Sequence, residues 1–294
     1  MSKNEIFFCI SNYNNDLRYL ISLGYDYLIY DKTHSGGSAD NDNTSYVPKS
    51  NLNEYIDSKK VISSSLNGYN IYDYLKFIVD HYDCLPKRVA FLKGNVVGRH
   101  VSQSFFVNSL NKKGFIGLFE NKTPYINNNN LKSNGSFIIT PDNFFLEKNT
   151  SFYLLQKKNP IKYFYSTKNF YNFCFKNSKF FPYLNFFPGA CFIVDKENIM
   201  QYPKIFYKNL LTFITHHRVP GESLMLERLL PSILSNRYDL SENMKVELTQ
   251  NLLDLLQKDV KKRNNIIYFT FRKFIGLLTK IFGYLLIRSI KIIN

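Results

Sequence analysis

The beginning of the chain alternates short apolar runs with amphipathic segments. Residues 6–10 are apolar and lead into a polar turn, and residues 17–24 repeat apolar side chains at helical spacing until Gly24. A second apolar run occupies residues 26–31. Strand, helix and strand in this order predict an α/β fold whose sheet is mostly parallel.

Later segments extend the same pattern. Residues 71–79 have one apolar face and predict a helix that ends at Pro86, after which residues 88–92 form a third apolar run. A glycine turn at Gly189 precedes a fourth run, residues 190–194. We predict that these four runs lie in one sheet of Rossmann type, flanked by helices. Further helices are expected over residues 204–214, 222–234 and 242–258.

The C-terminal end differs from the rest in charge. Of the 38 Lys and Arg residues, eight lie between Val260 and Asn294, where there is no acidic residue, and the rest of the chain is only mildly basic. The sequence therefore predicts one α/β domain over residues 1–258 and a basic amphipathic tail over residues 259–294.

The tail has too many charges to cross a membrane. Lys273, Lys280 and Arg288 interrupt every apolar stretch, whereas a membrane-spanning helix needs about 20 apolar residues. On a helical wheel most of the basic residues gather with small and polar residues within about 120°, with Arg288 as the main exception, which favours a helix lying on an anionic membrane surface. The alternative is that the apolar face packs on the protein itself or on a partner.

A net charge of +15 is also found in nucleic-acid-binding proteins, but no recognised reader motif is present, so we expect no nucleic-acid partner. Residues 1–5 lead directly into the first apolar run and lack the features of a signal peptide. We therefore expect a cytoplasmic protein that is peripheral on the inner face of the cell membrane.

Candidate binding residues follow the first and third predicted strands. Ligands of open parallel sheets bind at the carboxyl ends of the strands, where Ser11 and Asn12 follow the first run. Lys93 ends the third, and Gly94 allows the backbone to approach a ligand closely. A fixed cation such as Lys93 can neutralise a departing diphosphate, although a surface lysine in a tight turn has the same sequence. Asn95 and His100 complete the predicted donor-binding residues of this segment.

No metal site is predicted. Asp40-Asn41-Asp42 has the D-x-D spacing that can hold a divalent ion, but it follows Gly36-Gly37-Ser38 and not a strand, so a solvated loop is the favoured interpretation. His216-His217 provides too few ligands for zinc, and with Arg218 it forms either a phosphate-binding loop or a polar connector. No cofactor is firmly expected, with Mn²⁺ or Mg²⁺ as the alternative.

Glu227 is the predicted general base. It lies among leucines on the helix expected over residues 222–234, and a carboxylate in apolar surroundings needs a partner or a chemical role. Glu222 lies in the first turn of that helix, where the helix dipole alone favours a carboxylate. Asp195, after the fourth apolar run, is the second candidate base.

Four blocks, in order, resemble a family of uncharacterised fungal and bacterial proteins. Asn67-Gly68 precedes an amphipathic helix, and residues 81–95 resemble the family pattern nYd.LPd..vFlQG. Residues 188–194 resemble its GA.F.V strand, and residues 226–229 its ER.W helix. The sequence departs from the family at Lys93, where the family has Gln, at Tyr69-Asn70, where it has Arg-Glu, and at Leu229 or Leu230, where it has Trp.

The resemblance implies a nucleotide-sugar glycosyltransferase of GT-A type, in a setting of surface-polysaccharide synthesis. It adds Gly189 and Ala190 to the predicted donor-binding residues. We therefore expect transfer from a nucleotide-sugar donor to a capsule or lipooligosaccharide glycan, or to another lipid-linked acceptor. The alternative is a non-catalytic glycosyltransferase-like subunit of an envelope-glycan assembly complex.

Overall fold

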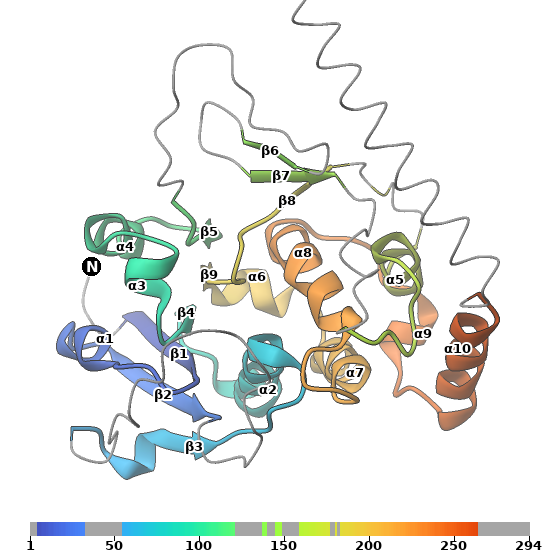
Figure 1. Ribbon diagram of the computed structural model, residues 1–294, viewed down its shortest axis with the longest axis horizontal. Helices are drawn as coiled ribbons and strands as arrows, with labels where there is room; N and C mark the ends of the chain where they lie inside the picture. The colour runs from blue at the N-terminus through green and yellow to red at the C-terminus, as the bar shows by residue number, and fades with distance from the viewer. Residues whose placement is uncertain are drawn as a thin grey trace, which may run out of the picture.

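The computed structural model describes residues 5–32, 55–120, 137–139, 145–148, 159–176, 180 and 183–263. In this part of the chain the main sheet has six strands, in the order β3-β2-β1-β4-β9-β5 (Figure 1). Its strands are β1 (Ile6–Asn12), β2 (Asp26–Asp31), β3 (Val61–Ser63), β4 (Arg88–Lys93), β5 (Ile116–Gly117) and β9 (Phe192–Asp195).

The sheet is mixed, with a parallel part and an antiparallel part. β1 pairs in parallel with β2 and β4, and β2 pairs in parallel with β3. β9 runs antiparallel to both β4 and β5. The four predicted runs therefore do lie in one mostly parallel sheet, as the sequence predicted. Because β9 is antiparallel to β4, however, the end of β9 lies beside the start of β4.

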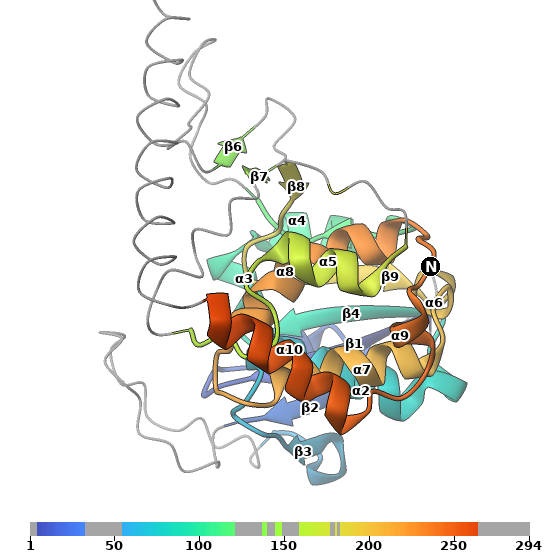
Figure 2. The same cartoon turned by 90° about the vertical axis from the view of Figure 1, so that its right-hand side faces the viewer.

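Helices cover both faces of the sheet, and a small second sheet lies beside it (Figures 1 and 2). The small sheet has the order β6-β7-β8 and consists of β6 (Phe137–Ile139), β7 (Phe145–Lys148) and β8 (Tyr183–Asn185). The helices are α1 (Arg18–Ser22), α2 (Tyr69–His81), α3 (Val96–Arg99), α4 (Gln103–Leu110), α5 (Thr167–Cys174), α6 (Lys196–Met200), α7 (Lys204–Ile214), α8 (Gly221–Ser235), α9 (Glu242–Lys245) and α10 (Gln250–Arg263), with single 3-10 turns η3 (Ser58–Lys60) and η4 (Tyr82–Cys84).

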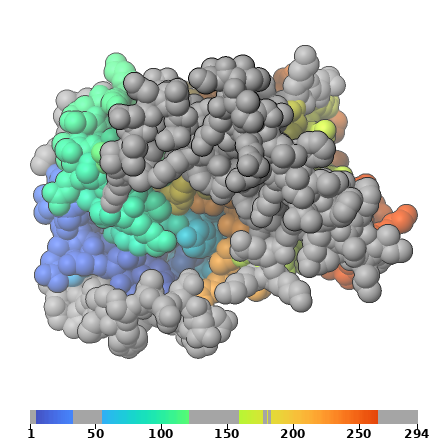
Figure 3. All heavy atoms as spheres, turned by 45° about the horizontal axis from the view of Figure 1, so that its top comes forward, coloured from blue at the N-terminus to red at the C-terminus, as the bar shows by residue number. Residues whose placement is uncertain are grey.

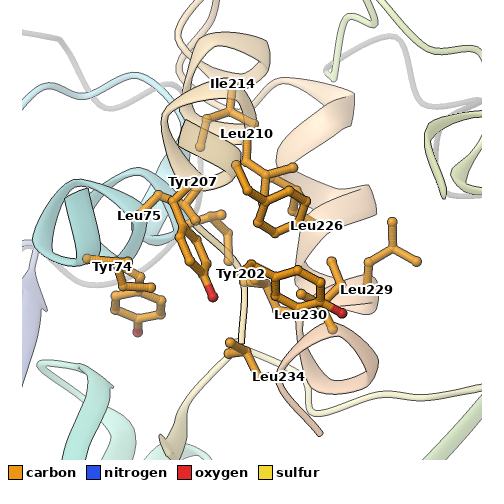
Figure 4. Close-up of a cluster of buried hydrophobic side chains, with 14 of the residues drawn as sticks. Tyr74, Leu75, Tyr202, Tyr207, Leu210, Ile214, Leu226, Leu229, Leu230 and Leu234 are labelled. Atoms are coloured by element: carbon orange, nitrogen blue, oxygen red, sulfur yellow. The ribbon is translucent and has the colours of Figure 1, made fainter. Parts of the chain in front are cut away.

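The larger of two hydrophobic cores lies between the sheet and α2, α7 and α8. Leu75 of α2, Tyr207 of α7 and Leu226 of α8 are fully buried and converge there (Figure 4). The smaller core lies on the opposite face, where Leu20 of α1 and Phe106 of α4 pack with Phe8 of β1. Alternate residues of β1 and β4 therefore point into different cores, as the pleat of a strand requires.

The C-terminal part corrects one predicted helix. The segment 242–258 is two helices, α9 and α10, separated by residues 246–249. Because α10 continues to Arg263 and buries Val260, the boundary predicted at residue 258 falls inside a packed helix. Residues 264–294, most of the predicted tail, lie outside the described residues. Among the described helices, none combines the length and apolar character needed to span a bilayer.

Candidate functional site

The candidate site lies where the carboxyl ends of β1 and β4 meet. The two strands pair in register, with Ser11 opposite Lys93. These side chains point toward the face covered by α2, and the next residues, Asn12 and Gly94, face α1. The main-chain bond from the Gly94 N–H to the Ser11 carbonyl, 3.0 Å long, holds the two loops together as they leave the sheet. Polar groups therefore lie on both faces of the sheet at the carboxyl ends of these two strands.

Lys93 is held against an aromatic ring and not against a carboxylate. Its ammonium donates to the Tyr69 hydroxyl at 2.5 Å and lies 4.1 Å from the centre of that ring. Its backbone N–H points at the Cys191 sulfur, 3.4 Å away. Among the described residues no carboxylate oxygen lies within ion-pair distance of the Lys93 ammonium. The charge is positioned by its neighbours without being neutralised by them.

Arg218 brings a second cation to the same edge. Its carbonyl accepts from the Tyr69 N–H at 3.0 Å, and the neighbouring His217 carbonyl accepts from the Gly68 N–H at 2.9 Å. The Arg218 guanidinium lies 5.5 Å from the ring centre of Tyr13, a half-exposed residue in the loop after β1. The loop between α7 and α8 is thus fastened to the start of α2, and its cation faces the end of β1.

A buried ionic network lies directly beneath these groups. The Asp73 carboxylate, which is fully buried on α2, accepts from the Ser11 and Ser64 hydroxyls at 2.5 Å each and pairs with the Lys32 ammonium at 3.1 Å. Lys32 also donates to the Ser65 carbonyl. Burial raises the pKa of the Asp73 carboxyl, whereas Lys32 and the two hydroxyls favour its charged form. Burial likewise lowers the pKa of Lys32, and Asp73 opposes that shift.

On the α1 face, Asn12 fixes the loop after β1. Its amide is fully buried, donates to Asp31 at 3.1 Å and accepts from the backbone N–H of Asn15 at 3.1 Å. Gly94 packs against it so closely that a Cβ there would lie 2.7 Å from the Asn12 Oδ1. Asn12 therefore positions the edge of the site, and Gly94 is required by this close contact.

The loop before β9 closes the third side. The Gly189 N–H donates to the Glu227 carboxylate at 2.9 Å, and the Gly189 carbonyl accepts from the Asn70 side chain at 3.1 Å. His100 covers the other side of Gly189, where a Cβ would come within 2.6 Å of the imidazole ring. Gly189 has a φ of +94°, so this position excludes other residues by both conformation and space.

Backbone strain is concentrated around Lys93. Among the described residues, three non-glycine residues have positive φ: Asn14 at 54°, Tyr69 at 59° and Ala190 at 50°. Tyr69 contacts Lys93 directly, Ala190 precedes Cys191, which also contacts Lys93, and Asn14 lies in the loop after β1. Such conformations cost about 1–3 kcal/mol each and cluster at functional sites. Their convergence at the ends of β1 and β4 makes this the candidate functional region of the described structure.

A cavity of about 300 Å³ opens beside the same edge, on the α1 face. It lies between the start of α1, the loop after β4 and the start of α4. The lining residues come from two parts of the chain, near residues 16–20 and 94–103, and Figure 3 shows the blue and green surfaces of these parts of the chain next to each other. The carboxyl ends of β1 and β4 thus have two cations, Lys93 and Arg218, on one face of the sheet and a cavity on the other.

The structure brings together most of the predicted site residues. Lys93, Gly189, Ala190, Glu227 and His100 lie around one loop, with Gly94 and Asn95 directly after Lys93. Ser11 and Asn12 are also at this edge, but their side chains are buried and bonded to Asp73 and Asp31. In this arrangement they hold the site in place through contacts within the protein.

Asp195 is the exception. Because β9 is antiparallel to β4, Asp195 pairs with Arg88 at the start of β4, five residues before Lys93 and so about 17 Å away along the strand. Its carboxylate accepts from the Arg88 Nε at 2.7 Å and from the Gly114 N–H at 2.7 Å. Asp195 therefore stabilises the opposite end of β4 from Lys93 and cannot act as a base beside Lys93.

Glu222 and His216 form a structural contact. The fully buried Glu222 carboxylate accepts from the backbone N–H groups of Lys162 and Tyr163 at 2.7 Å each, and its second oxygen lies 2.9 Å from the His216 Nε2. This carboxylate does more than complement a helix dipole, because it fastens residues 162–163 to the start of α8. His216 is thereby engaged as part of a connector.

The D-x-D segment that could bind Mn²⁺ or Mg²⁺ is not part of the described structure. Asp40 and Asp42 both lie outside the described residues. Within the described ranges, no three His, Cys, Asp or Glu side chains gather closely enough to hold a metal ion.

Sequence reasoning missed four important residues: Lys32, Tyr69, Asp73 and Arg218. Asp73 carried a usable signal, since it is a carboxylate between Tyr72 and Tyr74 and one helical turn before Phe77 in a predicted helix. Arg218 was noted only as part of a possible phosphate loop. Lys32 and Tyr69 carried no local signal, because their roles depend on contacts with residues far away in the sequence.

Comparison with known proteins identifies a family but no activity. A profile of the family described as "Protein of unknown function (DUF3431)" matches residues 37–243, well over half of the chain. The match includes Tyr69, Asp73, Lys93, Gly189, Arg218 and Glu227. Neither a curated protein nor a solved structure matches the chain significantly.

The buried ionic network gives a first testable prediction. Replacing Asp73 by Asn leaves the Lys32 ammonium buried without its counter-charge, so we expect Asp73→Asn to lower the free energy of unfolding by about 3–5 kcal/mol. Urea denaturation followed by circular dichroism measures this loss. Combining it with Lys32→Met removes the uncompensated charge and should restore part of the stability.

The matched control lies on the same helix. Asp80 forms an exposed pair with Lys76 at 2.5 Å, and such pairs contribute about 0.5 kcal/mol or less. Asp80→Asn should therefore change stability little. If Asp73→Asn and Asp80→Asn have equal effects, the network does not hold the site in place.

Proposed function

We propose that this chain, which belongs to the DUF3431 family of proteins of unknown function, is a glycosyltransferase of GT-A-like type. In this proposal a nucleotide-sugar donor binds at the carboxyl ends of β1 and β4, and its sugar passes to a surface-glycan acceptor. The observation that carries the proposal is the pair of cations, Lys93 and Arg218, held at this edge without a carboxylate partner among the described residues.

The strand order supports a nucleotide site at this place. The β3-β2-β1-β4 part of the sheet has the 3-2-1-4 order of nucleotide-binding α/β folds. The chain leaves β1 toward β2 on one side and leaves β4 toward β5 and β9 on the other, so the switch point lies between β1 and β4. Ligands of open α/β sheets bind at this point.

The two cations suit a diphosphate leaving group. Breaking the bond between sugar and diphosphate leaves additional negative charge on the phosphate oxygens, and a fixed positive charge lowers the energy of that state. The Tyr69 hydroxyl holds the Lys93 ammonium, whereas the Tyr69 N–H holds the backbone of Arg218, whose guanidinium lies over the Tyr13 ring. Positions fixed before the ligand binds reduce the reorganisation that the reaction requires.

Glu227 is our proposed base for the acceptor hydroxyl. Its Oε1 is fixed by the Gly189 N–H at 2.9 Å, and its Oε2 has a longer contact of 3.6 Å to the Arg228 guanidinium. One oxygen thus orients the carboxylate, and the other can accept a proton. The side chain is largely buried, so the Gly189 N–H and the surrounding helix hold the carboxylate in one position.

A second function is favoured by the same contacts. Both Glu227 oxygens already have partners in the protein, and the Asp73 carboxylate is sealed from solvent. Two cations beside carboxylates that are already engaged suit a non-catalytic glycosyltransferase-like subunit that binds a nucleotide sugar within an envelope-glycan assembly complex. Tight donor binding without turnover would identify this alternative.

For localisation we propose the inner face of the cell membrane. Residues 264–294 carry the amphipathic basic pattern, and the last turn of α10 already presents Lys261 and Lys262 at the surface. Basic residues near an anionic leaflet contribute about 1 kcal/mol each. Such an anchor would hold the body close to a lipid-linked acceptor.

Donor binding tests the proposed cation site. Removing the Lys93 ammonium should weaken binding of UDP- or GDP-sugars at least tenfold, which is about 1.4 kcal/mol. Isothermal titration calorimetry measures the change in Lys93→Ala, and Lys93→Arg should recover part of the affinity. Lys87 is an exposed lysine at the opposite end of β4, so Lys87→Ala is the control that should bind normally. Normal binding by Lys93→Ala would move the donor elsewhere.

Turnover tests Glu227. In Glu227→Gln the side-chain oxygen can still accept from the Gly189 N–H, but the amide cannot accept the acceptor proton. We expect hydrolysis or transfer of the donor sugar to fall about 10²-fold, with donor affinity unchanged. Loss of binding instead of turnover would make Glu227 a positioning residue, and unchanged turnover would refute its role as a base.

Truncation tests the membrane proposal. Because Val260 is buried, the chain should be shortened after Arg263 and not at the predicted boundary. The full chain should bind phosphatidylglycerol vesicles at low salt, and the shortened chain should remain folded but stay unbound in co-sedimentation. Neutral phosphatidylcholine vesicles are the control. A full chain that ignores anionic vesicles contradicts the proposal.

A further inference from the structure

The cavity on the α1 face has no role in the reaction described so far. Its volume of about 300 Å³ corresponds to roughly ten water molecules and is far larger than the voids of a packed core. Volumes of about 300–1,000 Å³ are typical of small-molecule sites. The lining residues are Asp16, Tyr19, Leu20, Gly94, Val97, Gly98, Val101, Ser102 and Gln103.

The cavity begins one residue after the proposed diphosphate site. Lys93 points to the α2 face, and Gly94, the next residue, lines the cavity. Gly94 packs closely on Asn12, Asn15 and Leu17, so no passage leads through the sheet at this position. A ligand whose phosphates contact Lys93 therefore reaches the cavity by passing over the chain at the end of β4.

The lining is apolar on its walls and polar at its rim. Tyr19, Leu20, Val97 and Val101 provide the apolar surface. Gly98 has a φ of +89°, and a Cβ built there would meet nothing within 4 Å, so its backbone leaves space open for a ligand. An apolar slot of this size suits one flat ring system with its attached sugar, and not an extended glycan.

Three polar residues can set the orientation of such a group. Ser102 caps α4, and Gln103 begins it. Asp16 is exposed, and its carboxylate also accepts from the Arg18 backbone N–H at 2.9 Å. A carboxylate acceptor beside an apolar slot is suited to the hydroxyl groups of a ribose, and hydroxyl and amide groups to the polar edge of a base.

From these features we infer that the cavity binds the nucleoside part of the donor, with the base between Tyr19 and Val97 and the ribose toward Asp16. This inference rests on the proposed function for the identity of the ligand, and on the cavity for its position. The half-exposed Tyr13, which faces Arg218, is the competing position for the base and would leave the cavity empty.

A tryptophan reporter locates the base directly. The chain has no Trp, so Tyr19→Trp places a single fluorophore in the cavity wall. UDP, GDP, CDP or ADP should change its emission, whereas inorganic pyrophosphate should not. Tyr25 packs on Phe8 in the same core without lining the cavity, and Tyr25→Trp is the control that should remain silent.

A cavity-filling variant measures the contribution to affinity. By calorimetry, the best nucleoside diphosphate should bind the unmodified protein at least tenfold more tightly than pyrophosphate. Val97→Phe should abolish this difference and leave pyrophosphate binding unchanged. Val107 is exposed on α4, so Val107→Phe is the matched control. If Val97→Phe fails to fold, the Tyr19→Trp reporter still decides the question.

The outcomes separate this inference from the proposed function. Equal binding of pyrophosphate and nucleoside diphosphates, or nucleotide binding that leaves Tyr19→Trp silent, overturns the cavity assignment while the cation site stands. If neither pyrophosphate nor any nucleotide binds, the proposed function fails as well.

Discussion

The buried Asp73 carboxylate is the constraint on which the candidate site depends. It joins the end of β1 through Ser11, the residue after β2 through Lys32, and the segment before α2 through Ser64. Burial of this carboxylate is expensive, and the cost is offset only when all three partners are in place. The start of α2, and with it Tyr69, is therefore fixed relative to the strand ends.

Fixing Tyr69 in turn fixes the Lys93 ammonium and the backbone of Arg218. Its hydroxyl holds the Lys93 ammonium, and its backbone N–H holds the Arg218 carbonyl. The cost of this arrangement is visible in the backbone, because Tyr69 has a positive φ without being glycine. A buried ion pair below and a strained turn above are consistent with a site in which positions are set before any ligand arrives.

Local pattern was enough to predict the four longer strands and several of the helices, and non-local contacts decided the site. The third predicted strand and the helix over residues 204–214 agree with β4 and α7, because apolar periodicity records which face is buried. The direction of β9 could not be predicted in this way, because a short apolar run has the same pattern in either direction. The sequence therefore did not indicate that Asp195 lies beside the start of β4, far from Lys93. Likewise, no local feature shows that Lys32 meets Asp73, 41 positions away.

Glu227 shows why burial alone does not identify a base. The sequence correctly indicated that a carboxylate among leucines needs a partner, and the structure supplies one in the Gly189 N–H. Gly189 is itself enclosed by His100 and bonded to Asn70, which lies next to Tyr69 on α2. Glu227 thus acts on the loop before β9 whether or not it also moves a proton. A structural partner satisfies the electrostatic requirement of burial, so only chemistry at the second oxygen can add a catalytic role.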